Sequence, residues 1–303
     1  MKKVRETFEI LLGAVSLGLV WSVMTIGVYI TYRILDIADL TVEGTVAMGA
    51  AIAARIISAE VNPFIAIPLS LLGGMSAGLV TGLLHTVLRI PALLSGILTM
   101  IGLYSVNLRI LGRAQLSLLK VDTVYTVFEN MGISRTFSTI LFDLICVAII
   151  IASLYWFLGT EIGCAIRATG KNPQMVRAQG VDTNVTIILG LIISNGLVAL
   201  CGALLAQYQT FADVGMGSGS IVISLASVII GEVLFGKKSF MSRLISLVLG
   251  SILYRIIIAF VLKLGMPAND LKLFTALTVA FALSLPVLKR YLIPLKKSVK
   301  GGQ

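Results

Sequence analysis

Long apolar runs take up most of this chain and leave it few ways to fold. Nine runs lie at about residues 10–34, 44–59, 64–84, 92–112, 139–159, 185–208, 220–236, 244–264 and 272–288. A helix of roughly 20 apolar residues spans the hydrocarbon core of a bilayer. The stretches between the runs are shorter than about 30 residues, too short to bury a core of their own. The sequence therefore predicts an all-α polytopic membrane protein with a single transmembrane domain over residues 1–303.

Basic residues gather in four short segments, which predict the sidedness of the chain. They are Lys2, Lys3 and Arg5; Arg167, Lys171 and Arg177; Lys237, Lys238 and Arg243; and Lys289, Arg290, Lys296, Lys297 and Lys300. Short basic loops at the ends of membrane helices follow the positive-inside rule. The net charge of +10 therefore indicates a lipid bilayer as partner and not a nucleic acid. We expect all four patches, and with them both termini, to be cytoplasmic.

If all nine runs crossed, a cytoplasmic start would place the basic segment with Arg167, Lys171 and Arg177 outside the cell. We therefore expect one run not to cross. The weakest run is 44–59, which is short, rich in Ala and Gly, and contains Arg55. This predicts about eight crossings plus one re-entrant segment. A longer first segment broken into two short helices is the alternative for the same region.

A faint internal repeat supports a two-half arrangement. The stretches "ADLTVEGTVAMGAA" (38–51) and "ADVGMGSGSIVISLA" (212–226) each pass through polar or glycine residues into an apolar run, at an offset of 174 residues. Matching interrupted segments in two halves indicate a transport site, because unwound backbone is tolerated in a membrane only where it lines a cavity or is buried in protein.

Polar and glycine residues of the two interrupted segments are the candidate solute path. A carboxylate such as Glu43 is costly within a membrane and needs a partner or water. Capping of a helix start is the alternative role for Asp39 and Asp213. Asn195 and Gln207 are equally suited to line a solute path and to form hydrogen bonds between helices. The path residues that we predict are Asp39, Thr41, Glu43, Gly44, Asp213, Gly217, Ser218, Gly219 and Ser220.

Enzyme chemistry has few residues to use here. The chain has one histidine, His85, and its three cysteines lack metal or redox spacing. The stretch "ATGKN" lacks the first glycine and the Ser or Thr of a phosphate-binding loop. We therefore expect no catalytic residue, no metal site and no nucleotide hydrolysis in this chain.

A polar, basic segment, "CAIRATGKNPQMVRAQGVD" (164–182), lies between two apolar runs. Its interleaved apolar residues predict a short amphipathic helix, a turn at "GKNP" and a second short helix. The charges of Arg167, Lys171 and Arg177 alone would be enough to set the topology, and they need no helical pattern of apolar residues. Because the segment has such a pattern, we predict that the loop over 160–184 docks into a partner.

The stretch "EIGCAIRATGKNPQMVRAQGVDTNVTIILGLIISNGLVALCGALLAQYQ" resembles the cytoplasmic coupling loop and following helix of bacterial ABC importer permeases of the branched-chain amino acid and ribose type. The "DLTVEG" segment is most similar to permeases associated with tryptophan or tyrosine uptake. The residues that carry the family pattern are Gly163, Ala165, Arg167, Ala168, Asn172, Pro173, Ala178, Gly180, Gly202 and Ala203.

This resemblance implies a homodimeric permease in the bacterial inner membrane. A cytoplasmic ABC ATPase, which holds ATP and Mg, would dock on each coupling loop, and an extracellular substrate-binding lipoprotein would deliver the solute. The implied solute is an amino acid, aromatic in the most similar members, with a sugar or nucleoside as alternatives. A stand-alone secondary transporter or channel is the rival function. The coupling residues implied are Gly163, Ala165, Arg167, Ala168, Gly170, Asn172, Pro173, Ala178 and Gly180.

Overall fold

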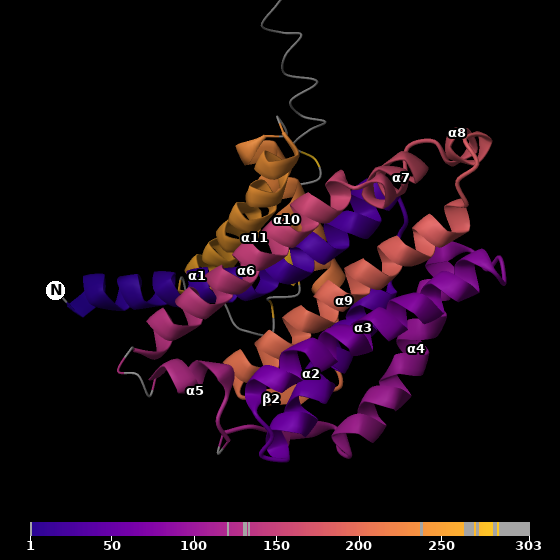
Figure 1. Ribbon diagram of the computed structural model, residues 1–303. Coiled ribbons are helices and arrows are strands. Elements are labelled where there is room, and N and C mark those ends of the chain that lie inside the picture. Colours follow the sequence, from indigo (N-terminus) through magenta and orange to yellow (C-terminus); the bar gives the residue numbers. More distant parts are fainter. Residues whose placement is uncertain are drawn as a thin grey trace, which may run out of the picture.

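The chain forms a bundle of long helices, seen here in a computed structural model (Figure 1). It describes residues 2–119, 121–129, 132, 134–236, 239–263, 270, 273–280 and 284. The elements are α1 (Lys2–Tyr29), η1 (Ile30–Leu35), α2 (Thr41–Ser58), α3 (Pro63–Thr86), α4 (Ala92–Leu111), β1 (Gln115–Ser117), α5 (Val124–Glu129), α6 (Arg135–Gly159), α7 (Glu161–Thr169), α8 (Pro173–Ala178), α9 (Thr183–Gln209), β2 (Phe211–Asp213), α10 (Ser220–Phe235) and α11 (Phe240–Lys263).

Seven helical segments of the described part are long and apolar enough to cross a membrane, which confirms the prediction of an all-α polytopic protein. They are α1 with η1, α2, α3, α4, α6, α9 and α11, while α10 is shorter at 16 residues. Several predicted features fall outside the described residues. These are Lys237, Lys238, the patch from Lys289 to Lys300, most of the run 272–288, and the side chains of Lys2, Lys3 and Arg5.

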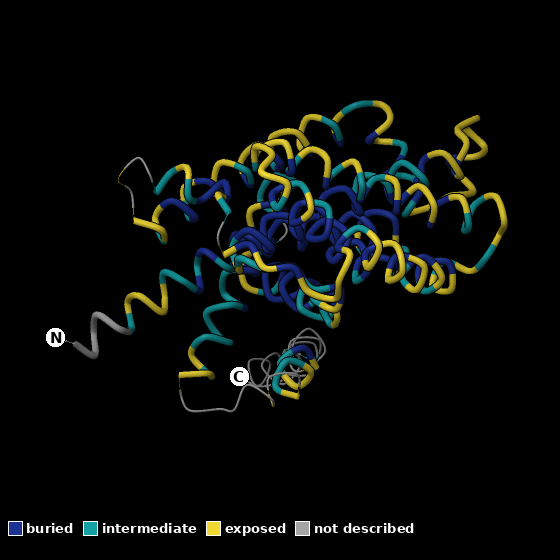
Figure 2. Tube along the Cα trace, turned by 90° about the horizontal axis from the view of Figure 1, so that it is seen from below, coloured by how far each residue is buried: buried dark blue, intermediate teal, exposed yellow. Residues whose placement is uncertain are grey.

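Helix α9 lies at the centre and packs against α1, α2 and α3. Small residues bring the backbones into contact, so that a Cβ on Gly49 of α2 would overlap the carbonyl group of Ala199 on α9. Such close packing holds helices together in lipid, where the hydrophobic effect does not. Figure 2 shows the buried centre and the exposed outer faces. The outer helices α4 and α6 expose large apolar side chains, such as Ile101 and Ile149, as lipid contact requires.

The two ends of the bundle carry different short elements (Figure 1). Helices α7 and α8 occupy one end, and α5 with the antiparallel β1–β2 ribbon occupies the other. Helix α6 leads from the ribbon end to α7, and α9 leads back from α8 to β2. Positions along α6 and α9 therefore give the depth of every neighbouring residue.

Helix α1 begins at the end of the bundle away from α7. The Ser16 hydroxyl donates to Thr139 Oγ1 at 2.9 Å near the start of α6, whereas Gly170, directly after α7, abuts Ile34 of η1. With 25 residues, α6 is about 37 Å long, so these contacts lie on opposite faces. The expectation that the N-terminus shares a face with residues 160–184 is wrong. Three basic residues at the start of α1, offset by nearby acidic ones, did not set its orientation.

Residues 36–40 break the first long segment, and α2 then runs back through the bundle. Asp36 ends η1 in the left-handed backbone region at φ 57°. The start of α2 contacts Thr81, near the end of α3, and its last turns pack against β1 and β2. Both forms expected for this region are wrong: α2 has 18 residues and is itself long and apolar enough to cross a membrane, so it is neither re-entrant nor half of a first segment broken into two short helices. With an external start to α1, every run can cross without a conflict of charge.

A second interrupted segment follows β2, where residues 214–219 form turns before α10 begins. The backbone of Gly217 abuts the Glu43 carbonyl group, and the Gly219 N–H donates to Glu43 Oε1 at 2.9 Å. The two halves of the predicted repeat therefore meet, with the N-terminus of α2 beside that of α10. The repeat pairs Thr41, where α2 starts, with Gly215. Helix α10 starts later, at Ser220, because residues 214–219 form turns.

Candidate functional site

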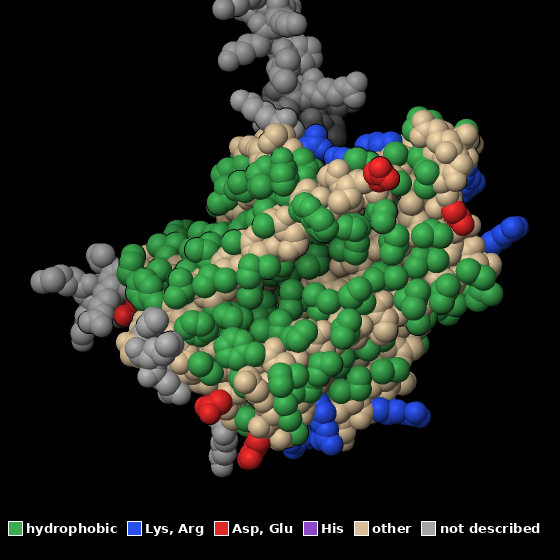
Figure 3. Space-filling model, in the orientation of Figure 1, with side chains coloured by type: hydrophobic (Ala, Val, Ile, Leu, Met, Phe, Trp, Pro, Cys, Tyr) green, Lys and Arg blue, Asp and Glu red, His purple; other side chains and the backbone are tan. Residues whose placement is uncertain are grey.

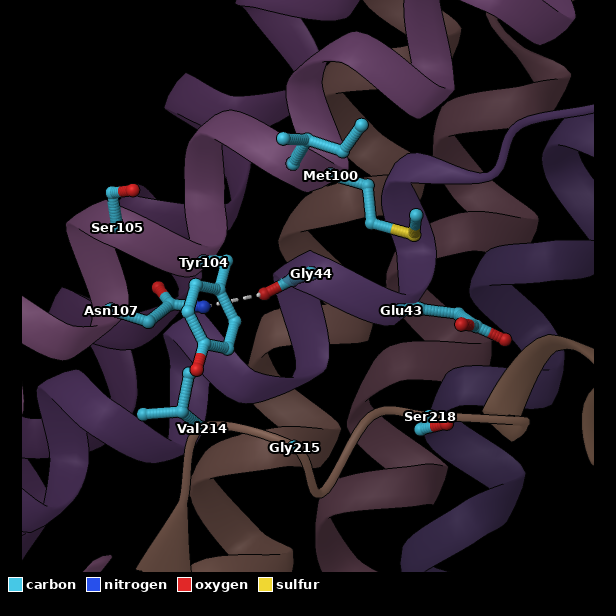
Figure 4. Close-up of a pocket in the computed structure, with 10 residues that line it drawn as sticks. Glu43, Gly44, Met100, Tyr104, Ser105, Asn107, Val214, Gly215 and Ser218 are labelled. Atoms are coloured by element: carbon cyan, nitrogen blue, oxygen red, sulfur yellow. Dashed lines mark hydrogen bonds between the residues drawn. The ribbon is translucent and has the colours of Figure 1, made fainter. Parts of the chain in front are cut away.

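A cavity of about 420 Å³ lies where α2, α4 and residues 214–218 meet. Figure 4 shows Tyr104 and Asn107 on one side of it and Glu43 and Ser218 on the other. The volume is within the range of about 300–1,000 Å³ that is usual for small-molecule sites. The lining residues are Glu43, Gly44, Met100, Ile101, Tyr104, Ser105, Asn107, Val214, Gly215 and Ser218.

Glu43 is the charged group of this cavity. It lies in the first turn of α2, and its Oε1 accepts the Gly219 N–H, directly before α10. A carboxylate is favourable at a helix N-terminus, where free N–H groups carry partial positive charge. Glu43 is therefore held at two helix N-termini at once while it stays half-buried at the cavity wall.

Asn107 joins α4 to α2 beneath the cavity. Its Nδ2 donates to the Gly44 carbonyl oxygen at 3.0 Å (Figure 4), and its Oδ1 is buried without a hydrogen bond to the described residues. A Cβ on Gly44 would lie 3.0 Å from Leu103 Cδ1, so glycine permits this close approach. The unused Asn107 acceptor at the cavity suits a water or a polar solute group, because buried acceptors are costly to leave unpaired.

Asp39 and Thr41 lie in a buried network beside the cavity and not on its wall. Asp39 Oδ1 accepts the Thr41 N–H at 2.9 Å, and its Oδ2 accepts from Asn195 Nδ2 at 2.8 Å. Asn195 Oδ1 in turn accepts the Thr45 hydroxyl at 2.8 Å. The Thr41 hydroxyl bonds to Thr81. This network caps α2 and ties it to α9. For Asp39, this is the capping role that we gave as the alternative to lining a solute path.

In the second interrupted segment, too, some of the predicted path residues line the cavity and others shape the backbone beside it. Asp213 Oδ1 accepts the Gly215 N–H at 2.6 Å and shapes the turn, while Ser218 lines the cavity. Gly219 takes φ 79°, which favours glycine, and ends the turns at α10. Ser220 is buried, and its hydroxyl makes no hydrogen bond with the described residues.

The contribution of α4 is what the sequence reasoning missed. Met100, Tyr104 and Asn107 line the cavity, yet they lie in an uninterrupted apolar run whose one charge is Arg109, in its last turn. Their spacing of four and three residues places them on one helix face. That spacing, with a buried asparagine in it, was the available signal.

The segment 160–184 forms the two short helices and the turn that its pattern predicted. Thr160 Oγ1 accepts the Gly163 N–H at 3.3 Å at the start of α7, and Asn172 Oδ1 accepts the Met175 N–H at 3.0 Å at the start of α8. Pro173 occupies the first turn of α8, where its missing N–H costs nothing. Of the predicted coupling residues, Gly163, Asn172 and Pro173 therefore shape the loop locally, together with Thr160.

Of the other predicted coupling residues, some pack against neighbouring backbone and others are exposed to solvent. Gly163 and Gly170 face neighbouring backbone, which leaves no room for a Cβ, and Gly180 takes φ 85° in the turn after α8. Ala165 and Ala168 are half-buried, whereas Arg167 and Ala178 are exposed. Figure 1 shows α8 projecting from the end of the bundle. Its exposed face carries the apolar Met175, which is 44% exposed.

Comparison with known proteins agrees with this architecture. Residues 10–283 match the family described as "Branched-chain amino acid transport system / permease component". The chain is 40% identical over 269 residues to a tyrosine transport system permease protein of Clostridioides difficile (strain R20291), covering 89% of this chain and 88% of the relative. It is 26% identical over 220 residues to the ribose import permease protein of Escherichia coli (strain K12), covering 71% of this chain and 66% of that protein.

An uncharacterised protein of Rickettsia prowazekii (strain Madrid E) is 32% identical over 281 residues, which cover 91% of this chain and 97% of the relative. No solved structure matches the chain. The family match spans nearly all of the helices described above, and the resemblance first carried by residues 160–209 is confirmed. The chain therefore belongs to the family of branched-chain amino acid transport system permeases, and it is a multi-pass membrane protein of that family.

Proposed function

We propose that this permease carries an amino acid with an aromatic side chain into the cytoplasm as part of an ATP-driven ABC importer. The relative named as a tyrosine transport permease supports this solute class, at 40% identity over most of both chains. The observation that carries the proposal is the cavity at Glu43, which combines one carboxylate, two helix N-termini and an aromatic ring.

Each part of an aromatic amino acid has a matching group in this cavity. Glu43 offers a carboxylate for the ammonium group, and Ser218 with the turn backbone offers donors for the carboxylate. Tyr104 and Met100 provide an aromatic face and a polarisable thioether for a ring. Ribose has no charge, so a sugar would leave the Glu43 carboxylate without an opposite charge.

The proposed partners occupy opposite ends of the bundle. The α7–α8 segment receives a cytoplasmic ATPase that holds ATP and Mg, and the ribbon end faces the substrate-binding lipoprotein. A second copy of the chain completes the membrane core. Docking of a cytoplasmic ATPase on α7 and α8 would put the α7 end in the cytoplasm and the start of α1 outside. The exposed Arg167 and Met175 support the docking role of α7 and α8. ATP binding drives transport by favouring one of two states of the permease.

Uptake of labelled tyrosine tests the solute and the role of Glu43. The full transporter would be expressed in cells that lack their own aromatic uptake, with leucine and ribose as comparison solutes. Loss of an ionic hydrogen bond costs about 1.5–3 kcal/mol, so Glu43→Gln should lower tyrosine uptake at least tenfold. Glu60→Gln, which changes an exposed carboxylate outside the cavity, is the matched control. Equal uptake by both variants, or a preference for ribose, would contradict this assignment.

Co-purification tests the coupling role of α7. The tagged permease would be extracted in mild detergent, and the bound ATPase quantified by mass spectrometry. Arg167→Glu should reduce the bound ATPase while membrane insertion stays normal, because it reverses the charge of an exposed side chain on α7. Arg109→Glu, an exposed charge reversal on α4, should not. A permease that retains no ATPase, under conditions where known ABC complexes survive, would indicate a stand-alone transporter.

A further inference from the structure

A second cavity, of about 480 Å³, lies at the α7 end of the bundle between η1, α7, α10 and α11. It shares no lining residue with the cavity at Glu43. Its lining brings together four cations and one carboxylate, namely Arg33, Arg167, Lys171, Arg243 and Glu232. We call this cavity the basic cleft.

The charges of the basic cleft do not balance. Its lining holds four cations and the one carboxylate of Glu232, which is 7% exposed and whose Oε2 lies 2.6 Å from Arg33 Nη2. The three other cations are exposed, and they come from α7, the turn after it and the first turn of α11. The positive-inside rule requires basic residues near a membrane face but does not require them to converge on one cavity. Their convergence on one cavity therefore indicates an anionic ligand.

Helix α11 adds a further positive group. Ser239 and Phe240, at the start of this 24-residue helix, both line the basic cleft. Ser239 Oγ accepts the Ser242 N–H at 3.1 Å, so the first turn of α11 is ordered at the cavity wall. Free N–H groups at a helix start favour anions, phosphate above all.

Aromatic side chains place the basic cleft at the depth of lipid headgroups. Phe240 stacks on Tyr155 of α6 with 6.3 Å between ring centroids, and the Arg167 guanidinium lies 5.9 Å from the Phe240 ring centre. Tyr155 and Trp156 are 50% and 74% exposed on the last turns of α6. Exposed Trp and Tyr at helix ends mark the interface between hydrocarbon and headgroups. Figure 3 shows Lys and Arg side chains gathered beside apolar surface at the end that carries α7.

We propose that the basic cleft binds the phosphate of an anionic phospholipid headgroup, which bridges α7 to α11. Basic pockets between membrane helices on the cytoplasmic side are suited to such headgroups. The phosphate lies between Arg167 and Lys171 on one side and Arg243 with the start of α11 on the other. A free phosphate ion shares this chemistry but lacks acyl chains to contact the adjoining apolar surface. Binding itself needs no ATPase; only the cytoplasmic placement of α7 rests on the proposed function.

Native mass spectrometry of the full-length protein in detergent tests this proposal. The probes are phosphatidylglycerol and phosphatidylcholine with the same acyl chains, and the measured quantity is the bound lipid per protein. We expect a preference for phosphatidylglycerol that falls about fivefold for each cation removed, in Lys171→Gln and in Arg243→Gln. Arg109→Gln and Arg113→Gln, exposed cations toward the ribbon end, are the matched controls. Equal retention of the two lipids, or equal losses in the controls, would overturn the proposal.

Two further arms separate the sources of the phosphate and guard against misfolding. If millimolar inorganic phosphate displaces phosphatidylglycerol completely, the site takes free phosphate and the lipid assignment is overturned; persistence of the lipid supports it. Arg167→Lys should retain the lipid preference and Arg167→Gln should lose it, with both eluting as the wild type does on size exclusion. Because these measurements contain no ATPase, they are independent of the coupling experiment.

Discussion

The cavity at Glu43 and the α7–α8 segment are assembled in opposite ways. The cavity depends on contacts between distant parts of the chain, such as Glu43 with Gly219 and Asp39 with Asn195. The α7–α8 segment is shaped mainly by neighbours, since Thr160 and Asn172 each accept a backbone N–H three residues ahead. A change near the cavity should therefore disturb the whole bundle, whereas a change in α7–α8 should stay local.

The largest effect is expected at the contact between α2 and α9. In Gly49→Val the new side chain meets the Ala199 backbone, which cannot move without displacing α9. Overpacking of this kind costs on the order of 3 kcal/mol. The thermal midpoint in detergent should fall sharply, and monodisperse protein should be lost. Gly102→Val, at a helical glycine with open space around it, is the matched control and should behave as wild type.

A smaller loss is expected from Asp39→Ala. The substitution leaves the Thr41 N–H and one Asn195 donor bond without their acceptor, which costs about 2 kcal/mol. Thermal unfolding in detergent measures the effect, and Asp39→Asn should recover part of it. Asp122→Ala, an exposed carboxylate with one weak contact, supplies the baseline. A midpoint unchanged from that baseline would show that the network does not tie α2 to α9.

The smallest effect should follow from Asn172→Ala, because it removes one cap from a six-residue helix. Loss of such a cap costs about 1 kcal/mol locally. Limited proteolysis should cut residues 170–182 faster while the thermal midpoint of the bundle stays unchanged, and Asn172→Ser should restore resistance. A fall in the midpoint as large as that of Asp39→Ala would break the distinction between the two regions.

The same distinction explains what could be predicted from the sequence. Helix length and apolarity report directly on membrane crossing, and Asn172–Pro173 with Gly180 are local signals for a helix start and a turn. The repeat located both interrupted segments, and the structure brings Glu43 of one into contact with Gly219 of the other.

Features that depend on distant contacts were beyond such signals. Tyr104 and Asn107 belong to the cavity because α4 packs on α2; their spacing places them on one helix face but does not say which helix that face contacts. The orientation of α1 was predicted wrongly. The prediction used the charges of Lys2, Lys3 and Arg5 in the same way as those of residues 160–184, whose position is fixed by packing. The basic cleft likewise forms from cations that are far apart in the sequence and become neighbours through the packing of η1, α7, α10 and α11.

Backbone contact at glycine has a further consequence for how the molecule moves. Helices α2, α3 and α9 touch through Gly49, Gly74 and Gly78 with no side-chain slack between them, so they can shift only as one rigid body. Helices α10 and α11 pack on each other across Gly231 and Gly250 in the same manner. The same kind of contact joins α1 to both bodies, since Gly27 abuts Ser194 of α9 and Gly18 abuts Ile252 of α11. Any relative motion of the two bodies must therefore be accommodated along α1, while the Glu43–Gly219 hydrogen bond links them where α2 and α10 begin.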